Sequence, residues 1–414
     1  MRKRVTTICC VVGLAVAAAS TTRAQSPEPR FPLFPVGVRW TKVIDGALAQ
    51  PPGFRESRAV LVLDDGKVTA YELDRGTPLW TVEGTATQAP VLSERHVFLV
   101  RDRTMVALDL SDGQPVWHLD LTAALSAPLS TISGWLFAVD DAANVTAYRT
   151  DDGSRIWTQP IGAPVVQPVS AEGDRVYVAR QDGTIVALQL ESGTPLWDRR
   201  IGGSPQPVLA LRDRVYVGSD DNYLYCLRSA NGQLDWRWRT GGDIVGRPGF
   251  DRDRIYPVSL DTVLRALDRQ SGAQRWKLAL SLRPTRGLVA GAGTLLVSGA
   301  GQTIQGVAMK DGSNAGSVDA GGLLAGPPHI APAPSLPSSL LVWVARSLSA
   351  GTTMTAVTRS LEPAFAPVQP LPDPTVVPSE GSDATDPAAP VAPPVVGEPP
   401  AGLPSTGGGT APVR

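Results

Sequence analysis

The sequence predicts an all-β fold, an eight-bladed β-propeller of four-stranded antiparallel blades. A tryptophan returns about every forty residues, turn residues separate short alternating strands within each period, and sustained 3.6-residue periodicity is lacking. Repeats of this length indicate an array, and a four-stranded antiparallel unit of about forty residues is typical of a propeller blade. The repeating tryptophans, which we expect to dock neighbouring blades, are Trp40, Trp80, Trp117, Trp157, Trp197, Trp236 and Trp276.

Length and charge limit the domain organisations and the functional classes to which this protein can belong. The chain has 414 residues, enough for two or three ordinary domains or for one large repeat domain with appendages. It carries 38 basic and 39 acidic side chains, and this balance argues against a nucleic-acid-binding protein, which usually has an excess of Lys and Arg.

Residues 1–24 are predicted to be a signal peptide. A basic start is followed by a short apolar core over residues 5–19, and small residues favour cleavage after Ala24. Cys9 and Cys10 lie too early to be the lipid-bearing cysteine of a lipoprotein, and they leave with the signal. We therefore expect a periplasmic or secreted protein that is not an evident lipoprotein and has no transmembrane segment in the mature chain.

Within each unit the spacing to the tryptophan is regular. A glycine stands four places before it from the second tryptophan onward, and a small residue stands ten places before it. In the fourth unit the strands are predicted over residues 165–169, 175–180, 184–190 and 195–201. Cys226 occupies the small-residue column, so we expect a buried, unreactive side chain. It is the only cysteine of the mature chain, which excludes an intrachain disulfide.

The propeller is predicted over residues 36–361. Its first strand is expected to complete its last blade. Strands at 340–344 and 353–357 supply two strands of an eighth blade, but no fourth strand follows them. The strand around Trp40 has no unit of its own, and pairing it beside Ala356 closes the ring and covers a sheet edge. Residues 25–35 are interpreted as an extended lead-in, and Pro327–Pro337 as an inserted surface loop.

Residues 362–414 have a different composition. They hold 14 of the 38 prolines, six acidic residues and one basic residue, with few large apolar side chains. Such a segment buries too little surface to offset its ordering entropy, so we predict a disordered acidic tail.

The repeat resembles that of a known family. Ala-Leu-Asp at 107–109 and at 266–268, each followed by a glycine and a tryptophan, resembles the pyrroloquinoline-quinone (PQQ) type repeat. In that repeat each tryptophan packs between blades against a small residue of the adjoining blade. Eight such blades behind an export signal resemble the BamB family of outer-membrane-protein assembly scaffolds. The resemblance implies a non-catalytic scaffold that binds envelope or outer-membrane proteins. We expect a monomer.

An alternative function is a PQQ-dependent dehydrogenase, or a propeller that binds a small ligand in its central channel. The family's enzymes hold Ca²⁺ with Glu, Asn and Asp, use an Asp base, and many have a vicinal disulfide. We find no such set of acidic and amide residues in any unit of the sequence. We therefore expect no catalytic residue and no bound cofactor. The alternative cofactor is PQQ with Ca²⁺. His96, His118 and His329 fall in different units, where we expect surface or turn positions and no metal site.

Two groups of charged residues are candidate interaction surfaces. Aspartates repeat in the hairpin between the second and third strands, either as turn caps or as a docking ring for a basic partner or Ca²⁺. They are Asp65, Asp102, Asp141, Asp182, Asp221 and Asp261. Arg247, Arg283 and Arg286 fall in connections between blades, on the same rim. They are either ordinary solvated charges or the partner-binding patch that we would test first.

Overall fold

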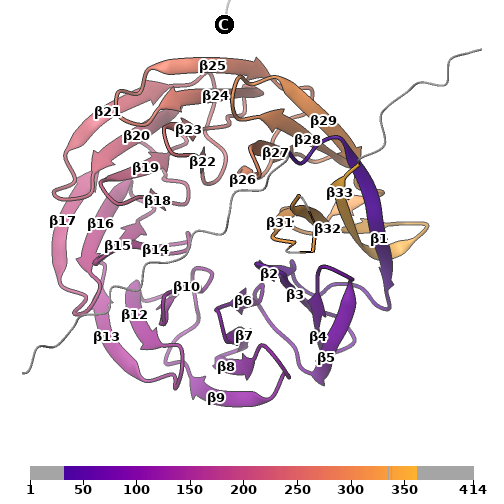
Figure 1. The fold of residues 1–414 in the computed structure, drawn as a ribbon. Coiled ribbons are helices and arrows are strands. Elements are labelled where there is room, and N and C mark those ends of the chain that lie inside the picture. Colours follow the sequence, from indigo (N-terminus) through magenta and orange to yellow (C-terminus); the bar gives the residue numbers. More distant parts are fainter. Residues whose placement is uncertain (1–31, 334, 337, 361–414) are drawn as a thin grey trace, which may run out of the picture. The chain divides into compact units, whose positions relative to one another are not determined.

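The structure, a computed structural model, describes residues 32–333, 335–336 and 338–360. Eight antiparallel sheets are arranged as blades around a central axis, with the first strand of each blade near the axis and the last on the outer rim (Figure 1). No residue in these described ranges is helical, and none of them forms a helix long and apolar enough to span a membrane. The predicted eight-bladed all-β propeller is confirmed.

Seven blades have four consecutive strands, and the eighth combines strands from both ends of the propeller. The first four blades are β2 (Gly53–Arg55), β3 (Arg58–Val62), β4 (Lys67–Glu72), β5 (Thr77–Glu83); β6 (Val91–Leu92), β7 (His96–Arg101), β8 (Thr104–Asp109), β9 (Pro115–Asp120); β10 (Ser130–Ile132), β11 (Trp135–Val139), β12 (Asn144–Arg149), β13 (Arg155–Pro160); β14 (Ser170–Glu172), β15 (Arg175–Ala179), β16 (Thr184–Gln189), β17 (Pro195–Arg200). The last four are β18 (Leu209–Ala210), β19 (Arg214–Gly218), β20 (Tyr223–Arg228), β21 (Leu234–Arg239); β22 (Gly249–Phe250), β23 (Arg254–Tyr256), β24 (Val263–Asp268), β25 (Gln274–Ala279); β26 (Val289–Gly291), β27 (Thr294–Ser298), β28 (Thr303–Ala308), β29 (Asn314–Asp319); β30 (Leu323–Leu324), β31 (His329–Ala331), β32 (Leu340–Ser347), β33 (Gly351–Arg359) with β1 (Val36–Ile44).

The middle strands follow the predicted alternation, but the first strand of the fourth blade does not. It was predicted at residues 165–169, whereas β14 covers Ser170–Glu172. Val165 and Val169 lie in the connection before β14 and are buried between the blades. Because both positions are buried, both hold apolar residues, and their spacing resembles that of a strand. The backbone there nevertheless belongs to no strand.

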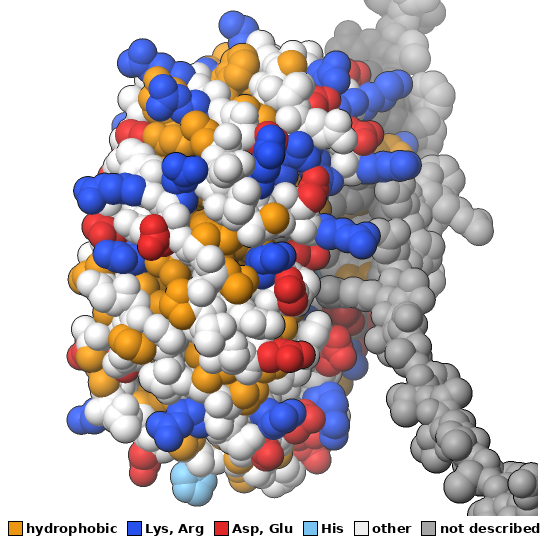
Figure 2. Space-filling view, turned by 90° about the vertical axis from the view of Figure 1, so that its left-hand side faces the viewer, with side chains coloured by type: hydrophobic (Ala, Val, Ile, Leu, Met, Phe, Trp, Pro, Cys, Tyr) orange, Lys and Arg blue, Asp and Glu red, His pale blue; other side chains and the backbone are white. Residues whose placement is uncertain are grey.

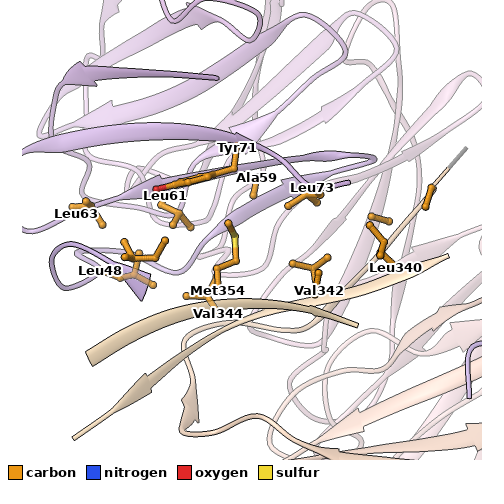
Figure 3. Close-up of a cluster of buried hydrophobic side chains, with 14 residues drawn as sticks. Leu48, Ala59, Leu61, Leu63, Tyr71, Leu73, Leu340, Val342, Val344 and Met354 are labelled. Carbon is orange, nitrogen blue, oxygen red and sulfur yellow. The ribbon is translucent and has the colours of Figure 1, made fainter. Parts of the chain in front are cut away.

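The two ends of the propeller meet in blade eight as predicted. β1 pairs with β33 in antiparallel register and places Trp40 opposite Ala356. Blade eight then packs on blade one through a buried apolar cluster that includes Leu61, Val342 and Met354 (Figure 3). Closure therefore joins segments from opposite ends of the sequence.

Each tryptophan of the column joins its blade to the next one. The indole N–H donates to a backbone carbonyl 30 to 33 residues further along, as from Trp157 to Leu190 (2.7 Å) and from Trp40 to Leu73 (3.1 Å). The ring covers the repeat glycine of that next blade, so that a Cβ added at Gly193 lies 2.6 Å from the ring of Trp157. These glycines also have positive φ, which is 70° at Gly193.

The small-residue column has a different role from the one that the resemblance implied. Ala187 pairs with Trp197 across β16 and β17 of the same blade, and Cys226 pairs with Trp236 in the same way. The residue of the adjoining blade that receives the indole is the glycine four places before the next tryptophan. The small residue therefore makes room inside the blade, and the glycine makes room between blades.

Blade seven has no tryptophan, and the lead-in replaces it. A Cβ on Gly316, which stands in the tryptophan column, would lie 2.6 Å from the ring of Phe34, and one on Gly306 would lie 2.4 Å from it. Leu33 and Phe34 are buried with Trp343 in the cluster between blades seven and eight. The N-terminal segment therefore fills a vacant docking position as well as completing blade eight.

The insertion at 327–337 is only partly the predicted surface loop. Its residues His329–Ala331 form β31, which pairs with β32, and Ala331 is fully buried. The prolines on both sides gave the stretch the composition of a loop. It nevertheless supplies an inner strand to blade eight.

Candidate functional site

The connections between blades and the second-to-third-strand hairpins lie on one rim of the propeller, as expected. Isolated bridges join the connection to the hairpin of the blade that it enters, as at Ile244–Ser259 and Pro284–Gly299. We call the connections over 240–248 and 280–288, which enter blades six and seven, the docking rim. They carry the three arginines singled out from the sequence.

The acidic residues of the hairpins mostly cap their own turns. The carboxylates of Asp65, Asp182, Asp221 and Asp261 each accept the backbone N–H two residues further on, at 3.0–3.2 Å. Three of them also pair with a base of the same hairpin, as Asp182 does with Arg180 (2.6 Å). These bonds are the local turn chemistry that aspartate favours.

Asp261 is the most strongly engaged of these carboxylates. Its partners are the Arg265 guanidinium (2.7 Å), the Ser259 hydroxyl (2.6 Å) and the N–H of Gly241 (2.9 Å), which belongs to the connection entering the same blade. Burial raises the pKa of Asp261, but these hydrogen bonds outweigh burial and lower it to about 2. This hairpin therefore holds the docking rim in place.

Arg247 and Arg286 lie on adjoining connections. The backbone of Gly287 is so close to that of Gly246 and Arg247 that a Cβ on Gly287 would lie 2.8 Å from the Arg247 nitrogen. The N–H of Gly246 also donates to the Gln206 side chain (3.1 Å), which links this connection to the previous one. The structure thus brings together two arginines that are 39 positions apart in the sequence.

Ion pairs do not neutralise these arginines within the described residues, although the Glu172 carboxylate acts on Arg247 from beyond ion-pair distance. Arg247 and Arg283 are exposed, and no salt bridge in the described residues involves either side chain. Arg286 is half-buried and donates to the carbonyl of Leu324 (3.3 Å). Surrounding protein lowers the pKa of Arg247 by desolvation, whereas Glu172 raises it. Arg247 is therefore accessible to solvent although protein surrounds much of its side chain.

The outer surface over blades four and five has a mixed character. Figure 2 shows basic, acidic and hydrophobic side chains interspersed on the side of the ring that carries β17. This face therefore has no patch in which charges of one sign gather, and we do not consider it as a charged interaction surface.

The histidines occupy three different environments, and one expectation about them was wrong. His96 begins β7 and is 3% exposed, so it is neither a surface nor a turn residue, and burial lowers its pKa. His118 is exposed on β9, and His329 stacks on Phe54 with ring centres 5.1 Å apart. In the part of the chain that the structure describes, no three His, Cys, Asp or Glu side chains are grouped to hold a metal ion.

A second polar site was not predicted from the sequence. A cavity of about 640 Å³ lies beside blade six, at the hairpins on the face opposite the docking rim, and five arginines line it. The signal available in the sequence was Arg269, because the corresponding position holds an uncharged residue in the other blades that carry the motif.

Comparison with known proteins places the fold among solved propellers. The structure is similar to BamB from Moraxella catarrhalis, with a TM-score of 0.63 and 15% identity over 78% of this chain and 99% of that one. It is also similar to the computationally designed Ika8 protein (TM-score 0.64, 14% identity, 80% and 99% covered). Quinohemoprotein alcohol dehydrogenase from Comamonas testosteroni shares 11% identity at a TM-score of 0.61, over 78% of this chain and 76% of that one. At these identities the likeness concerns the fold alone.

The sequence itself matches a family model. No curated protein sequence matches the chain. The model described as outer membrane protein assembly factor BamB matches residues 37–107, 101–212 and 181–321. The matched segments together cover residues 37–321, well over half of the chain, and they contain all seven docking tryptophans. The chain therefore belongs to the family of outer membrane protein assembly factor BamB.

Proposed function

We propose that the protein is an exported, non-catalytic scaffold that binds other envelope proteins during outer-membrane-protein assembly. Family membership supports this role, and so does the predicted signal peptide, which lies outside the described residues. The observation that carries the proposal is the docking rim. Its exposed arginines come from two adjoining connections and lack an acidic partner in the described residues.

The chemistry of the rim indicates the kind of partner. Arginine presents a planar fork of donors that suits carboxylates, and a cation that no acid neutralises attracts negative charge. Several rim amides, such as those of Ile244, Val245 and Thr285, are already engaged in the blade connections, so we assign recognition to the side chains. We therefore propose that the rim receives an acidic segment of an envelope protein, and that Arg247, Arg283 and Arg286 contact it.

The test replaces these three arginines with alanine in the full chain. Crosslinking pull-down from envelope extract, followed by identification of the captured proteins, should show loss of at least one partner that the unaltered protein captures. The matched control replaces Arg75, Arg149 and Arg155, three exposed arginines at the hairpins of the opposite face. Equal capture by both triple variants and the unaltered protein would discard the docking rim.

A separate measurement addresses the alternative function, which the similarity to a quinohemoprotein alcohol dehydrogenase keeps in view. The described residues provide no grouped ligands for a calcium ion, so we derive no reaction step through a quinone. We expect that adding PQQ with Ca²⁺ produces no saturable absorbance change and no dye reduction with alcohols. A stoichiometric absorbance change would replace the scaffold proposal with a cofactor-binding one.

A further inference from the structure

The cavity beside blade six is unusually rich in arginine. Its volume is about 640 Å³, which is within the range of small-ligand pockets. The lining includes five arginines and three aspartates, an excess of two positive charges, and Asp235 outside the lining also pairs with Arg214 (2.9 Å). The arginines are Arg214, Arg252, Arg254, Arg269 and Arg275.

Two of these guanidinium groups are held mainly by neutral backbone carbonyls, Asp213 lying at the limit of ion-pair distance from one of them. Arg254 donates to the carbonyls of Met309 (2.6 Å) and Lys310 (2.9 Å). Arg269 donates to the carbonyls of Arg252 (2.8 Å) and Asp251 (3.3 Å). A carbonyl holds the side chain in one orientation without cancelling its charge, so both cations remain available to an anion.

The aspartates neutralise the cavity only in part, and the exposed Asp253 is the third of them. Asp268 is paired with Arg275 at 2.6 Å, and Asp213 is paired with Arg214 at 2.6 Å and lies 4.0 Å from Arg269. Arg252 is exposed, and no hydrogen bond or ion pair of its side chain occurs in the described residues. The Nε of Arg269 is buried and has no hydrogen-bond acceptor.

The other blades show that the fold does not require this set of charges. Arg269 is seven places before its tryptophan, where the repeat elsewhere has Leu73, Leu110, Thr150, Leu190 and Ser229. The backbone carbonyl of this residue accepts the indole N–H of the preceding blade's tryptophan, as at Leu190 and Ser229, and any side chain can supply that carbonyl. Packing therefore explains the backbone at Arg269 but not its charge.

We propose that this cavity, the blade-six pocket, binds a small ligand that carries two or more oxyanion groups, either carboxylates or phosphates. Guanidinium groups bind such oxygens through paired, charge-assisted hydrogen bonds. Arg254 and Arg269 are pre-oriented by backbone carbonyls, which reduces the entropy lost on binding. Arg252 adds a third cation at the exposed side of the cavity. The site is on the face opposite the docking rim, so both can be occupied at once.

The test measures binding of two probes, pyrophosphate and citrate, to the full-length mature protein by isothermal titration calorimetry at low ionic strength. We expect saturable binding of at least one probe at a single site, and the better probe distinguishes phosphate from carboxylate ligands. Arg252→Gln and Arg269→Leu should each weaken binding by about tenfold or more, since each removes a charge-assisted hydrogen bond. Leucine at 269 is the residue that three other blades use there.

The control is Arg212→Gln. Arg212 is exposed at the position of the blade-five hairpin that corresponds to Arg252, and it does not line the cavity. Binding should stay within about twofold in this variant, because only a non-specific field would be reduced. Absence of saturable binding by both probes, or equal weakening by Arg212→Gln and Arg252→Gln, would overturn the proposal. If Arg269→Leu fails to fold, the binding measured with Arg252→Gln alone tests the proposal.

Discussion

Replacing Phe34 with alanine tests whether the lead-in is part of the propeller. The ring is 6% exposed and occupies the position that a tryptophan fills in the other blades. Truncation removes about 150 Å² of buried apolar surface, which corresponds to about 4 kcal/mol at 25 cal/mol per Å². Compact unfolded chains make this an upper value, so we expect a loss of about 3–4 kcal/mol, as for other buried Phe→Ala changes.

The assay is thermal unfolding followed by circular dichroism. A domain of roughly 330 residues has an unfolding entropy of about 0.7 kcal/mol/K, so the expected decrease in melting temperature is about 5 °C. Val38→Ala is the matched control, because Val38 is also near the N-terminus of the propeller but is 70% exposed. Its expected effect is below 1 °C. If Phe34→Ala shifts the melting temperature no more than Val38→Ala does, the lead-in does not hold blades seven and eight together.

Three further predictions concern the blades themselves. Trp157→Ala should cost about 3–5 kcal/mol in urea unfolding, because the ring and its bond to the Leu190 carbonyl hold two blades together, and an unchanged midpoint would contradict this. Asp261 has a pKa of about 2, below its unfolded value, so it stabilises the fold above about pH 4 and loses this effect as the pH falls toward 2. The stability of the unaltered protein should therefore exceed that of Asp261→Asn by at least about 2 kcal/mol at pH 7, and the gap should narrow below pH 4. Burial raises the pKa of Cys226 to about 12, so a thiol reagent should react only after denaturant is added, and rapid reaction of the native protein would refute that burial.

The parts of the fold that repeat were predictable from sequence. The period of the tryptophans, the glycines before them and the turn residues all recur, so each copy supports the others. The pairing of Trp40 with Ala356 could also be predicted, because a strand without a blade and a blade without a strand have only each other as partners. Errors occurred where one copy departs from the rest, as at β31 and at the valines before β14.

The candidate sites were harder to predict because side-chain charge does not repeat with the fold. The sequence located Arg247, Arg283 and Arg286 in the connections, but it could not show that the first and third lie on adjoining backbones. For the aspartates it favoured turn caps over a docking ring, because aspartate is common in turns for local reasons. The hydrogen bonds of four of them favour caps, since these carboxylates are already bonded to their own turns.

The blades of a propeller can be compared with one another, because equivalent positions show which residues the fold requires. Some departures from the repeat are explained by packing. Gly316 replaces a tryptophan because Phe34 occupies the space, and Cys226 replaces an alanine of similar size opposite Trp236. Arg269 has no such explanation, since five other blades place an uncharged side chain there and keep the same indole bond. A charge that the fold does not need, beside other cations held by neutral carbonyls, is therefore best explained by a ligand.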